Sequence, residues 1–213
     1  MSNIRRVFVE KKDEFAVEAH GLLADLRNNL GMTGLKNIRI INRYDVMGLS
    51  DEEFRMAKEL VLSEPPVDSV VEETLPVAEG AKVFAMELLP GQYDQREDFA
   101  EQCIQLITQK DRPMVSAAKV YVLEGEISDA DFETIKAYCI NPIEAREAEQ
   151  AKPETLVSTC EEPEKVKTVA GFLTMSKEEA EELRKSMGLA MSLEDLLWCQ
   201  KYFNEEQIGR AHV

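Results

Sequence analysis

The sequence predicts an α+β fold built from two similar halves, followed by a linker and a small helical segment. The chain of 213 residues is long enough to bury a hydrophobic core, and 44% of its residues are hydrophobic against 31% that are charged. Strand-like and helix-like segments alternate along residues 1–150, and one segment near residue 50 recurs near residue 128. Together these observations favour a duplicated α+β domain.

The repeat is the strongest internal signal, with a period of about 78 positions. Gly48–Lys58 recurs as Glu126–Lys136, and the two segments match at Ser, Asp, Phe and Lys. Upstream, Val7-Phe8 aligns with Val83-Phe84. Because neither copy can cover both faces of its own sheet, we expect two ferredoxin-like repeats that pack sheet against sheet as a pseudo-dimer.

The first half begins with a predicted strand and helix. Residues 4–10 are rich in β-branched and aromatic side chains, as strands are. Apolar residues then recur at steps of three and four, as one face of a helix requires, and Gly31 ends that helix. The predicted apolar face of this helix comprises Phe15, Ala19, Leu22, Leu23, Leu26 and Leu30.

A second strand and helix complete this half. Residues 37–44 alternate as a strand does, and Ser50 with Glu53 forms a capping box that opens the second helix. Pro65-Pro66 ends that helix, because proline cannot continue it. Residues 67–75 are the predicted closing strand.

The second half repeats this order. Lys82–Leu89 and Ala118–Leu123 are the predicted strands, and Ser128 caps the last helix. The helix between the two strands presents an apolar face formed by Phe99, Cys103, Leu106 and Ile107. We place the two repeats at 1–76 and 77–150.

The composition changes from Asn141 onward, where charged residues and prolines replace large apolar ones. Residues 144–153 therefore read as a linker, and residues 151–207 as the start of a linker domain. Ser176 and Ser192 each begin a short helix. The second of these helices carries a predicted docking face, which favours self-association and a missing partner. That face comprises Leu193, Leu196, Leu197, Trp198 and Phe203.

Charge and composition exclude several functions. The formal net charge of −16 disfavours nucleic acid, because an acidic surface repels phosphate backbones. Four widely spaced cysteines and two histidines give no zinc motif, and Cys103 and Cys139 read as buried apolar filler. No apolar run is long enough for a membrane helix, and the start of the chain lacks a secretory signal, so we expect a cytoplasmic protein with no membrane partner.

No catalytic motif is present. The glycine-rich phosphate loops, the serine nucleophile elbow and the zinc-protease helix motif are all missing. His20 has no nucleophile near it in sequence and reads as a surface histidine. We therefore expect no catalytic, cofactor-binding or metal-binding residues in this chain, although an enzyme with a site hidden from sequence reasoning stays a further alternative.

One loop of the second half is longer than its counterpart, Lys11-Lys12-Asp13, in the first. A turn at Pro90-Gly91 with Asp94 as a helix cap explains it in structural terms. Polar residues held at a strand-to-helix junction also suit contact with another domain. The candidate interface loop comprises Pro90, Gly91, Gln92, Tyr93, Asp94, Gln95 and Arg96.

At this loop the sequence resembles the N-terminal region of the large, single-chain phosphoribosylformylglycinamidine synthases. The resemblance covers nearly the whole chain. The segments that carry it are 4–12, 15–19, 42–46, 90–96, 100–106 and 188–196.

The resemblance implies a function as well as a fold. In that family a duplicated N-terminal domain mimics a dimer of the small subunit found in multi-chain versions, and a helical linker domain joins it to synthetase and glutaminase domains. The family uses ATP, magnesium and glutamine to amidate formylglycinamide ribonucleotide in purine biosynthesis. Its catalytic motifs would follow position 206, so this fragment is expected to be a scaffold, to bind no cofactor and to be inactive alone.

The last residues depart from the family. Ile208–Val213 resembles the translation of a sequencing adapter, so we expect 208–213 to be a non-native tail of a truncated reading frame. The expected partners are then the missing synthetase and glutaminase domains of the same chain. The alternative is a free-standing interaction or regulatory protein with tandem ferredoxin-like repeats and no catalytic role.

Overall fold

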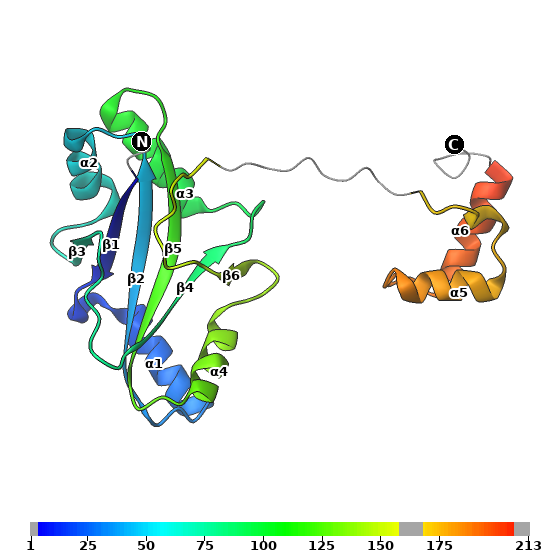
Figure 1. Cartoon of the computed structure of the whole chain (residues 1–213), viewed down its shortest axis with the longest axis horizontal. Helices are drawn as coiled ribbons and strands as arrows, with labels where there is room; N and C mark the ends of the chain where they lie inside the picture. The colour runs from blue at the N-terminus through cyan, green and yellow to red at the C-terminus, as the bar shows by residue number, and fades with distance from the viewer. Residues whose placement is uncertain (1–3, 158–167, 207–213) are drawn as a thin grey trace. The chain divides into compact units, whose positions relative to one another are not determined.

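The computed structural model describes residues 4–157 and 168–206, which belong to two compact units, Met1–Thr159 and Cys160–Val213 (Figure 1). The expected tail at 208–213 lies outside the described residues. The first unit carries a mixed sheet-and-helix architecture, and the second unit is helical where it is described. The α+β class is therefore confirmed.

A six-stranded antiparallel sheet forms the first unit, in the order β3-β1-β2-β5-β4-β6. Each half of the sequence supplies three neighbouring strands, and the long strands β2 and β5 join the halves from Leu35↔Gly125 to Met47↔Met114. The expected packing of sheet against sheet is therefore wrong: the halves meet edge to edge in one continuous sheet. The strands are β1 Arg5–Lys11, β2 Leu35–Met47, β3 Asp68–Glu72, β4 Lys82–Leu88, β5 Met114–Gly125 and β6 Ala145–Glu147.

The helices begin and end at the residues that the sequence indicates. Ser50 and Glu53 form the capping box of α2, and the side chain of Ser128 accepts the backbone N–H of Asp131 at the start of α4. Gly31 follows α1 with a φ of 69°, a left-handed conformation that glycine adopts without strain. The helical elements are η1 Asp13–Phe15, α1 Val17–Asn29, α2 Asp51–Ala57, a π-helical turn η2 Lys58–Leu62, α3 Gln95–Thr108 and α4 Asp129–Cys139.

Helices of the two halves contribute to the same buried clusters. Leu26 of α1 packs in one cluster with Ile135 of α4 and Phe84 of β4. Phe54 of α2 packs in another cluster with Ile104 of α3. Figure 1 shows α2 and α3 near one end of the central strands and α1 and α4 near the other. Each helix-covered core therefore takes residues from both repeats, and neither repeat has a core of its own.

The sheet register corrects the alignment of the first strands. Val7 and Phe84 are both fully buried in the helix-covered cores, whereas Phe8 packs with Ala85 in the cluster on the opposite face. Val7 therefore corresponds to Phe84, one position away from the alignment based on matching residue types. Side chains alternate between the faces of a strand, so a shift of one residue exchanges the two faces.

The segment expected as a linker is part of the sheet and of its second face. Ala145–Glu147 forms β6, and the strap, which we define as residues 148–152, follows it. Arg6, which bonds both carboxylate oxygens of Asp45 at 2.7 Å, also donates to the backbone carbonyl of Gln150 at 2.5 Å. Arg43 donates to the carbonyl of Glu149 at 2.7 Å. Composition missed this segment because backbone carbonyls and the small side chains of Ala145 and Ala148 hold it, rather than large apolar residues.

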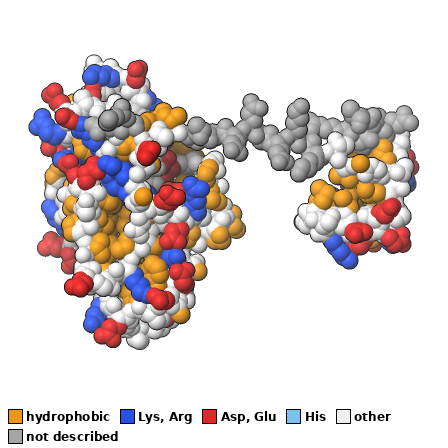
Figure 2. Space-filling view, in the orientation of Figure 1, with side chains coloured by type: hydrophobic (Ala, Val, Ile, Leu, Met, Phe, Trp, Pro, Cys, Tyr) orange, Lys and Arg blue, Asp and Glu red, His pale blue; other side chains and the backbone are white. Residues whose placement is uncertain are grey.

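The second unit contains η3 Phe172–Thr174, α5 Lys177–Ser186 and α6 Leu193–Glu206. Its expected docking face is divided between interior and surface. Leu196 is buried and Phe203 packs edge-on against Phe172, with 6.4 Å between the ring centroids. Trp198 is 63% exposed and stacks on Tyr202. Figure 2 shows hydrophobic side chains gathered at the surface of this unit.

Candidate functional site

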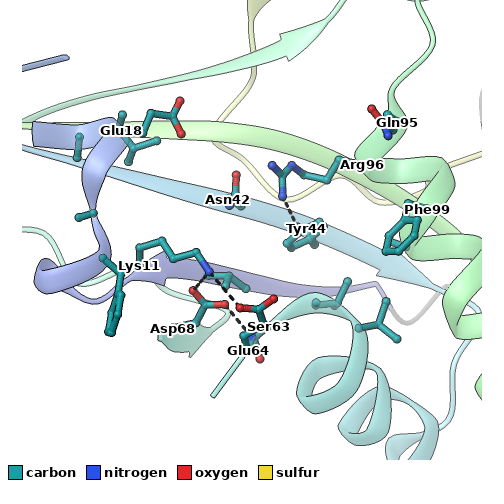
Figure 3. A pocket seen from close by; sticks show the side chains of 18 of the residues that line it. Lys11, Glu18, Asn42, Tyr44, Ser63, Glu64, Asp68, Gln95, Arg96 and Phe99 are labelled. Atoms are coloured by element: carbon teal, nitrogen blue, oxygen red, sulfur yellow. Dashed lines mark hydrogen bonds and ion pairs between the residues drawn. The ribbon is translucent and has the colours of Figure 1, made fainter. Parts of the chain in front are cut away.

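A groove of about 700 Å³ opens on the helix-covered face of the first unit (Figure 3). It lies between the start of α1, the turn η2 and the start of α3, and strands β1 and β2 contribute to its lining. Its apolar lining consists of Val9, Phe15, Ala16, Ala19, Ile40, Val61, Leu62, Phe99 and Ala100. The other lining residues are polar or charged, so the groove combines apolar and polar groups in about equal measure, and its size falls in the range of small-molecule binding sites.

The groove exists because the middle of β2 interrupts the two cores. Every second residue of β2 faces the helices, and Asn42 occupies the position between Ile40 and Tyr44. Asn42 is half-buried and opposes Lys119 of β5 in the ladder. Asn42 therefore lines the groove between the two cores, and Lys119 reaches Glu18 of α1.

Most charged groups in the groove are already paired. Lys11 contacts Asp68 at 2.8 Å, and Asp68 also accepts the backbone N–H of Glu64 at 2.7 Å. Glu18 of α1 accepts a hydrogen bond from Lys119 at 2.6 Å. These contacts join β1 to β3 and α1 to β5, and they leave little free charge on that side.

Arg96 differs from these paired groups. Its Nη1 donates to the hydroxyl of Tyr44 at 3.0 Å, and Figure 3 shows the side chain reaching from α3 to β2. Burial acts to lower the pKa of Arg96, but the hydrogen bond to Tyr44 and the charges of Asp94 and Glu18 raise it on balance. The guanidinium is therefore charged, and its hydrogen-bond acceptor is the Tyr44 hydroxyl rather than a carboxylate.

The candidate interface loop divides into two parts. Gly91, with a φ of 92°, and the bond from Gln92 N–H to the carbonyl of Leu89 form the turn that the sequence indicates at Pro90. These residues do not line the groove, and neither does Tyr93. Asp94, Gln95 and Arg96 do line it.

The predicted helix cap is confirmed. Asp94 Oδ1 accepts the backbone N–H groups of Arg96 at 2.8 Å and Glu97 at 3.2 Å. Tyr93 is 69% exposed and donates to Asp98 at 2.6 Å, a bond that raises the pKa of Tyr93. The loop is thus anchored to α3 at its end while the Tyr93 ring stays in solvent. Its role as an interface stays a prediction.

At one end of β5, hydrogen bonds from glutamate side chains of α3 take the place of pairing with a neighbouring strand. β4 pairs with β5 only as far as Met86↔Lys119, so the rest of that edge of β5 lacks a strand. Glu97 and Glu101 accept the backbone N–H groups of Ala117 at 2.7 Å and Val115 at 2.9 Å. Burial raises the pKa of Glu97 above its ordinary value, whereas the bond from Ala117 acts in the opposite direction.

The predicted apolar face of α3 lies largely in solvent. Phe99 is 62% exposed and Leu106 is 74% exposed, whereas Ala100 and Ile104 are buried. Small Ala100 lets the helix approach the sheet closely enough for its glutamates to reach β5. Helical spacing alone does not select between these adjacent faces, because both contain apolar residues.

The remaining candidate groups do not form a reaction centre with the groove. His20 contacts Asp13 at 3.0 Å on the surface, and Cys103, Cys139 and Cys199 are free and half-buried. Within residues 4–157 and 168–206, no three His, Cys, Asp or Glu side chains are grouped so that they could hold a metal ion. No helix in the described parts of the chain is long and apolar enough to cross a membrane.

Comparison of the chain with protein-family models finds no match, and comparison with curated proteins finds none either.

Proposed function

We propose that this chain is the non-catalytic N-terminal scaffold of a large, single-chain phosphoribosylformylglycinamidine synthase of the cytoplasm. The observation that carries the proposal is the duplicated order of the elements. Each half runs strand, helix, strand, helix, strand, and the two halves meet at the central pair β2 and β5. This arrangement supports the duplicated, dimer-like N-terminal domain that the resemblance implies.

The shared cores support a scaffold of fixed geometry. Because α1 and α4 contribute to one buried cluster, and α2 and α3 to another, the two repeats cannot separate without opening both helix-covered clusters. A platform of this kind holds neighbouring domains in a constant orientation without taking part in their chemistry. Backbone carbonyls of the strap accept hydrogen bonds from the buried Arg6 and Arg43, which holds the strap against the sheet.

The reaction itself belongs to the missing domains. In the proposed enzyme ATP activates the amide oxygen of formylglycinamide ribonucleotide, and ammonia from glutamine then displaces phosphate. ATP and magnesium would be bound by the synthetase domain, and glutamine would be hydrolysed in the glutaminase domain. The purified chain alone is expected to hydrolyse neither ATP nor glutamine.

A chimera tests the proposal. Residues 1–206 would replace the corresponding region of a known single-chain synthase, and glutamine-dependent amidation would be measured beside a version with that region deleted. We expect the chimera to retain amidation and the deletion to lose it. A chimera that is folded by circular dichroism and monodisperse, yet as inactive as the deletion, would overturn the proposal and favour a free-standing interaction protein.

The loop at residues 89–96 is proposed to face the partner domains and to help couple ammonia delivery. Tyr93 is exposed at the end of a turn that only the second repeat has, which supports a contact on one side of the platform. In an active chimera, Tyr93→Ala and Gln95→Ala should lower turnover with glutamine more than turnover with free ammonia. An equal loss with both nitrogen donors, or no loss, contradicts this role.

A further inference from the structure

The outward side of α3 is uncharged along three turns of the helix. Gln95, Phe99, Gln102 and Leu106 follow one another at steps of three and four, so they form one line along the helix, and all four are exposed. Half-buried Cys103 lies beside that line. We define these five residues as the α3 stripe. Because its members are amides, a thiol and apolar side chains, the stripe is neutral on a chain whose formal net charge is −16.

The charged residues of α3 are bonded within the unit. The two glutamates of α3 bond the edge of β5, and Arg96 bonds a hydroxyl on β2. Asp98 accepts the hydroxyl of Tyr93 at 2.6 Å. Beyond the end of α3, Lys110 pairs with Glu53 at 2.5 Å. These bonds hold the charges beside the stripe rather than on it.

The α3 stripe also exposes large apolar side chains. Phe99 is 62% exposed and Leu106 is 74% exposed, and the seven positions between them place them about 10 Å apart along the helix axis. On α2, by contrast, the exposed positions are Asp51, Glu52 and Arg55. Exposed apolar side chains in an uncharged surrounding indicate an interaction surface, and a line at helical spacing suits another helix.

The order of residues along the α3 stripe is matched to a second copy of itself. When two α3 helices lie antiparallel about a two-fold axis that passes between Gln102 and Cys103, Phe99 of each copy faces Leu106 of the other. Gln102 then faces Cys103, so small and uncharged side chains occupy the centre. Each copy therefore offers the apolar groups that the other lacks.

The charges permit this pairing and disfavour others. Two copies with a net charge of −16 repel each other, so they can approach closely only through a surface that lacks acidic groups. In the antiparallel arrangement Arg96 of one copy lies toward exposed, uncharged Gln109 of the other. A parallel arrangement would place Arg96 against Arg96, which is unfavourable.

We propose that the α3 stripe is a self-association surface, on which α3 of a second copy of this chain packs antiparallel and each Phe99 contacts the opposite Leu106. The two copies form a two-fold dimer in which both use the same surface. Because one helix from each copy makes the contact, the buried area is small and the dimer forms and dissociates with concentration.

The inference does not depend on the proposed function, because it concerns the chain by itself. A monomeric chain would remove the dimer and leave the scaffold role to the chimera experiment. An inactive chimera would remove the scaffold role and leave the dimer. The two failures are therefore distinguishable.

The first test is sedimentation velocity of the full chain at increasing concentration. We expect a reversible monomer–dimer equilibrium for the unmodified chain. Leu106→Glu should raise the dimer Kd by roughly 100-fold, because the two-fold axis buries the new carboxylate twice. The matched control is Ile143→Glu, since Ile143 is 81% exposed in the turn after α4 and lies outside the stripe. This control should leave the Kd unchanged.

A mixing experiment tests the antiparallel register. Phe99→Lys and Leu106→Glu should each make the chain monomeric when examined alone. Mixed in equal amounts, the two variants should form a heterodimer, because the lysine at 99 of one faces the glutamate at 106 of the other while the second contact stays native. A mixture that stays monomeric would overturn the proposed register and with it the proposal.

A cross-link distinguishes this surface from the exposed aromatic side chains of the second unit. A short bismaleimide should join Cys103 to Cys103 of the other copy, as peptide mass spectrometry would show. Trp198→Ala should leave the dimer intact. A chain that is monomeric up to about 0.5 mM, a dimer unaffected by Leu106→Glu, or a dimer lost in Trp198→Ala and linked through Cys199 would each overturn the proposal.

Discussion

Asp45 is the residue whose loss should destabilise the first unit most specifically. It is 2% exposed on the sheet face opposite the helices, between Arg6 at 4% and Arg43 at 6%. Its two carboxylate oxygens accept from the Arg6 guanidinium at 2.7 Å, and Arg43 lies 3.8 Å away. The perturbation we choose is Asp45→Asn, which keeps the shape of the side chain and removes its charge.

The magnitude follows from the burial of all three groups. With Asp45 neutralised, two buried guanidinium groups lose their anion, and the new amide places N–H donors against N–H donors. Removing one partner of a buried ion pair costs about 3–5 kcal/mol, because the remaining charge is left uncompensated. An exposed ion pair contributes roughly 0–1 kcal/mol. The matched control is therefore Asp51→Asn, since the Asp51 side chain is 94% exposed and pairs with Arg5.

Urea unfolding of the full chain, followed by circular dichroism, measures the difference. With a slope of about 2 kcal/mol per molar urea, Asp45→Asn should lower the midpoint by roughly 2 M, and Asp51→Asn by less than about 0.5 M. Hydrogen exchange supplies a local readout, because the strap depends on Arg6 and Arg43. The amide of Ala148, which bonds the carbonyl of Ala85 at 2.8 Å, should exchange faster in Asp45→Asn.

The result that would refute this reasoning is a small effect. If Asp45→Asn and Asp51→Asn shifted the midpoint equally, the two arginines would not depend on Asp45 for compensation. If Asp45→Asn prevents folding, Arg43→Met provides the second variant. It removes one arginine and its bond to Glu149, and it should speed exchange at Ala148 while the sheet stays folded.

Two further predictions concern the backbone and pH. A Cβ on Gly125, where φ is 138°, would lie 2.2 Å from the carbonyl oxygen of Gly34, so Gly125→Ala should lower the melting temperature. Gly21 lies in open space on α1, so Gly21→Ala should raise the free energy of unfolding by about 0.5–1 kcal/mol and the melting temperature with it. The reverse order in calorimetry would contradict this. The Lys110 ammonium and the N-cap serine hold the pKa of Glu53 at about 2, below its ordinary value of 4.5, so its stabilising contribution is present above pH 4.5 and is lost as pH falls toward 2. The free energy of unfolding should therefore fall more between pH 5 and pH 3 in the unmodified chain than in Glu53→Gln. Equal decreases in the two chains would count against this role of Glu53.

Local signals in the sequence predicted the elements well. The caps at Ser50, Ser128, Ser176 and Ser192 are all present, because a cap depends on a few neighbouring residues. Gly31 likewise ends α1. Such features need no knowledge of how distant segments pair.

Long-range features were the ones that sequence reasoning missed. Edge-to-edge pairing of β2 with β5 depends on contacts between residues far apart in the chain, and the shift between Val7 and Phe84 changes no local pattern. The strap is held through backbone carbonyls, which every residue carries, so composition gave no sign of it. Of the groove, the sequence indicated Asp94, Gln95 and Arg96 through the long loop and missed the rest, because β1, β2 and η2 meet there only in the folded chain.

The differences between the halves are where the candidate functions lie. Duplication alone would produce equivalent surfaces on both sides of the β2 and β5 pair. β1 leaves β2 after Glu10↔Ile41 and leads into α1 within a few residues. β4 leaves β5 after Met86↔Lys119, but a longer loop precedes α3. That departure frees an edge of β5 for the glutamates of α3 and brings Arg96 over the groove. β2 likewise has no β1 partner from Leu35 to Ile40, so the halves differ in the loop before α3 and in its glutamates, and this difference supports a one-sided contact at α3.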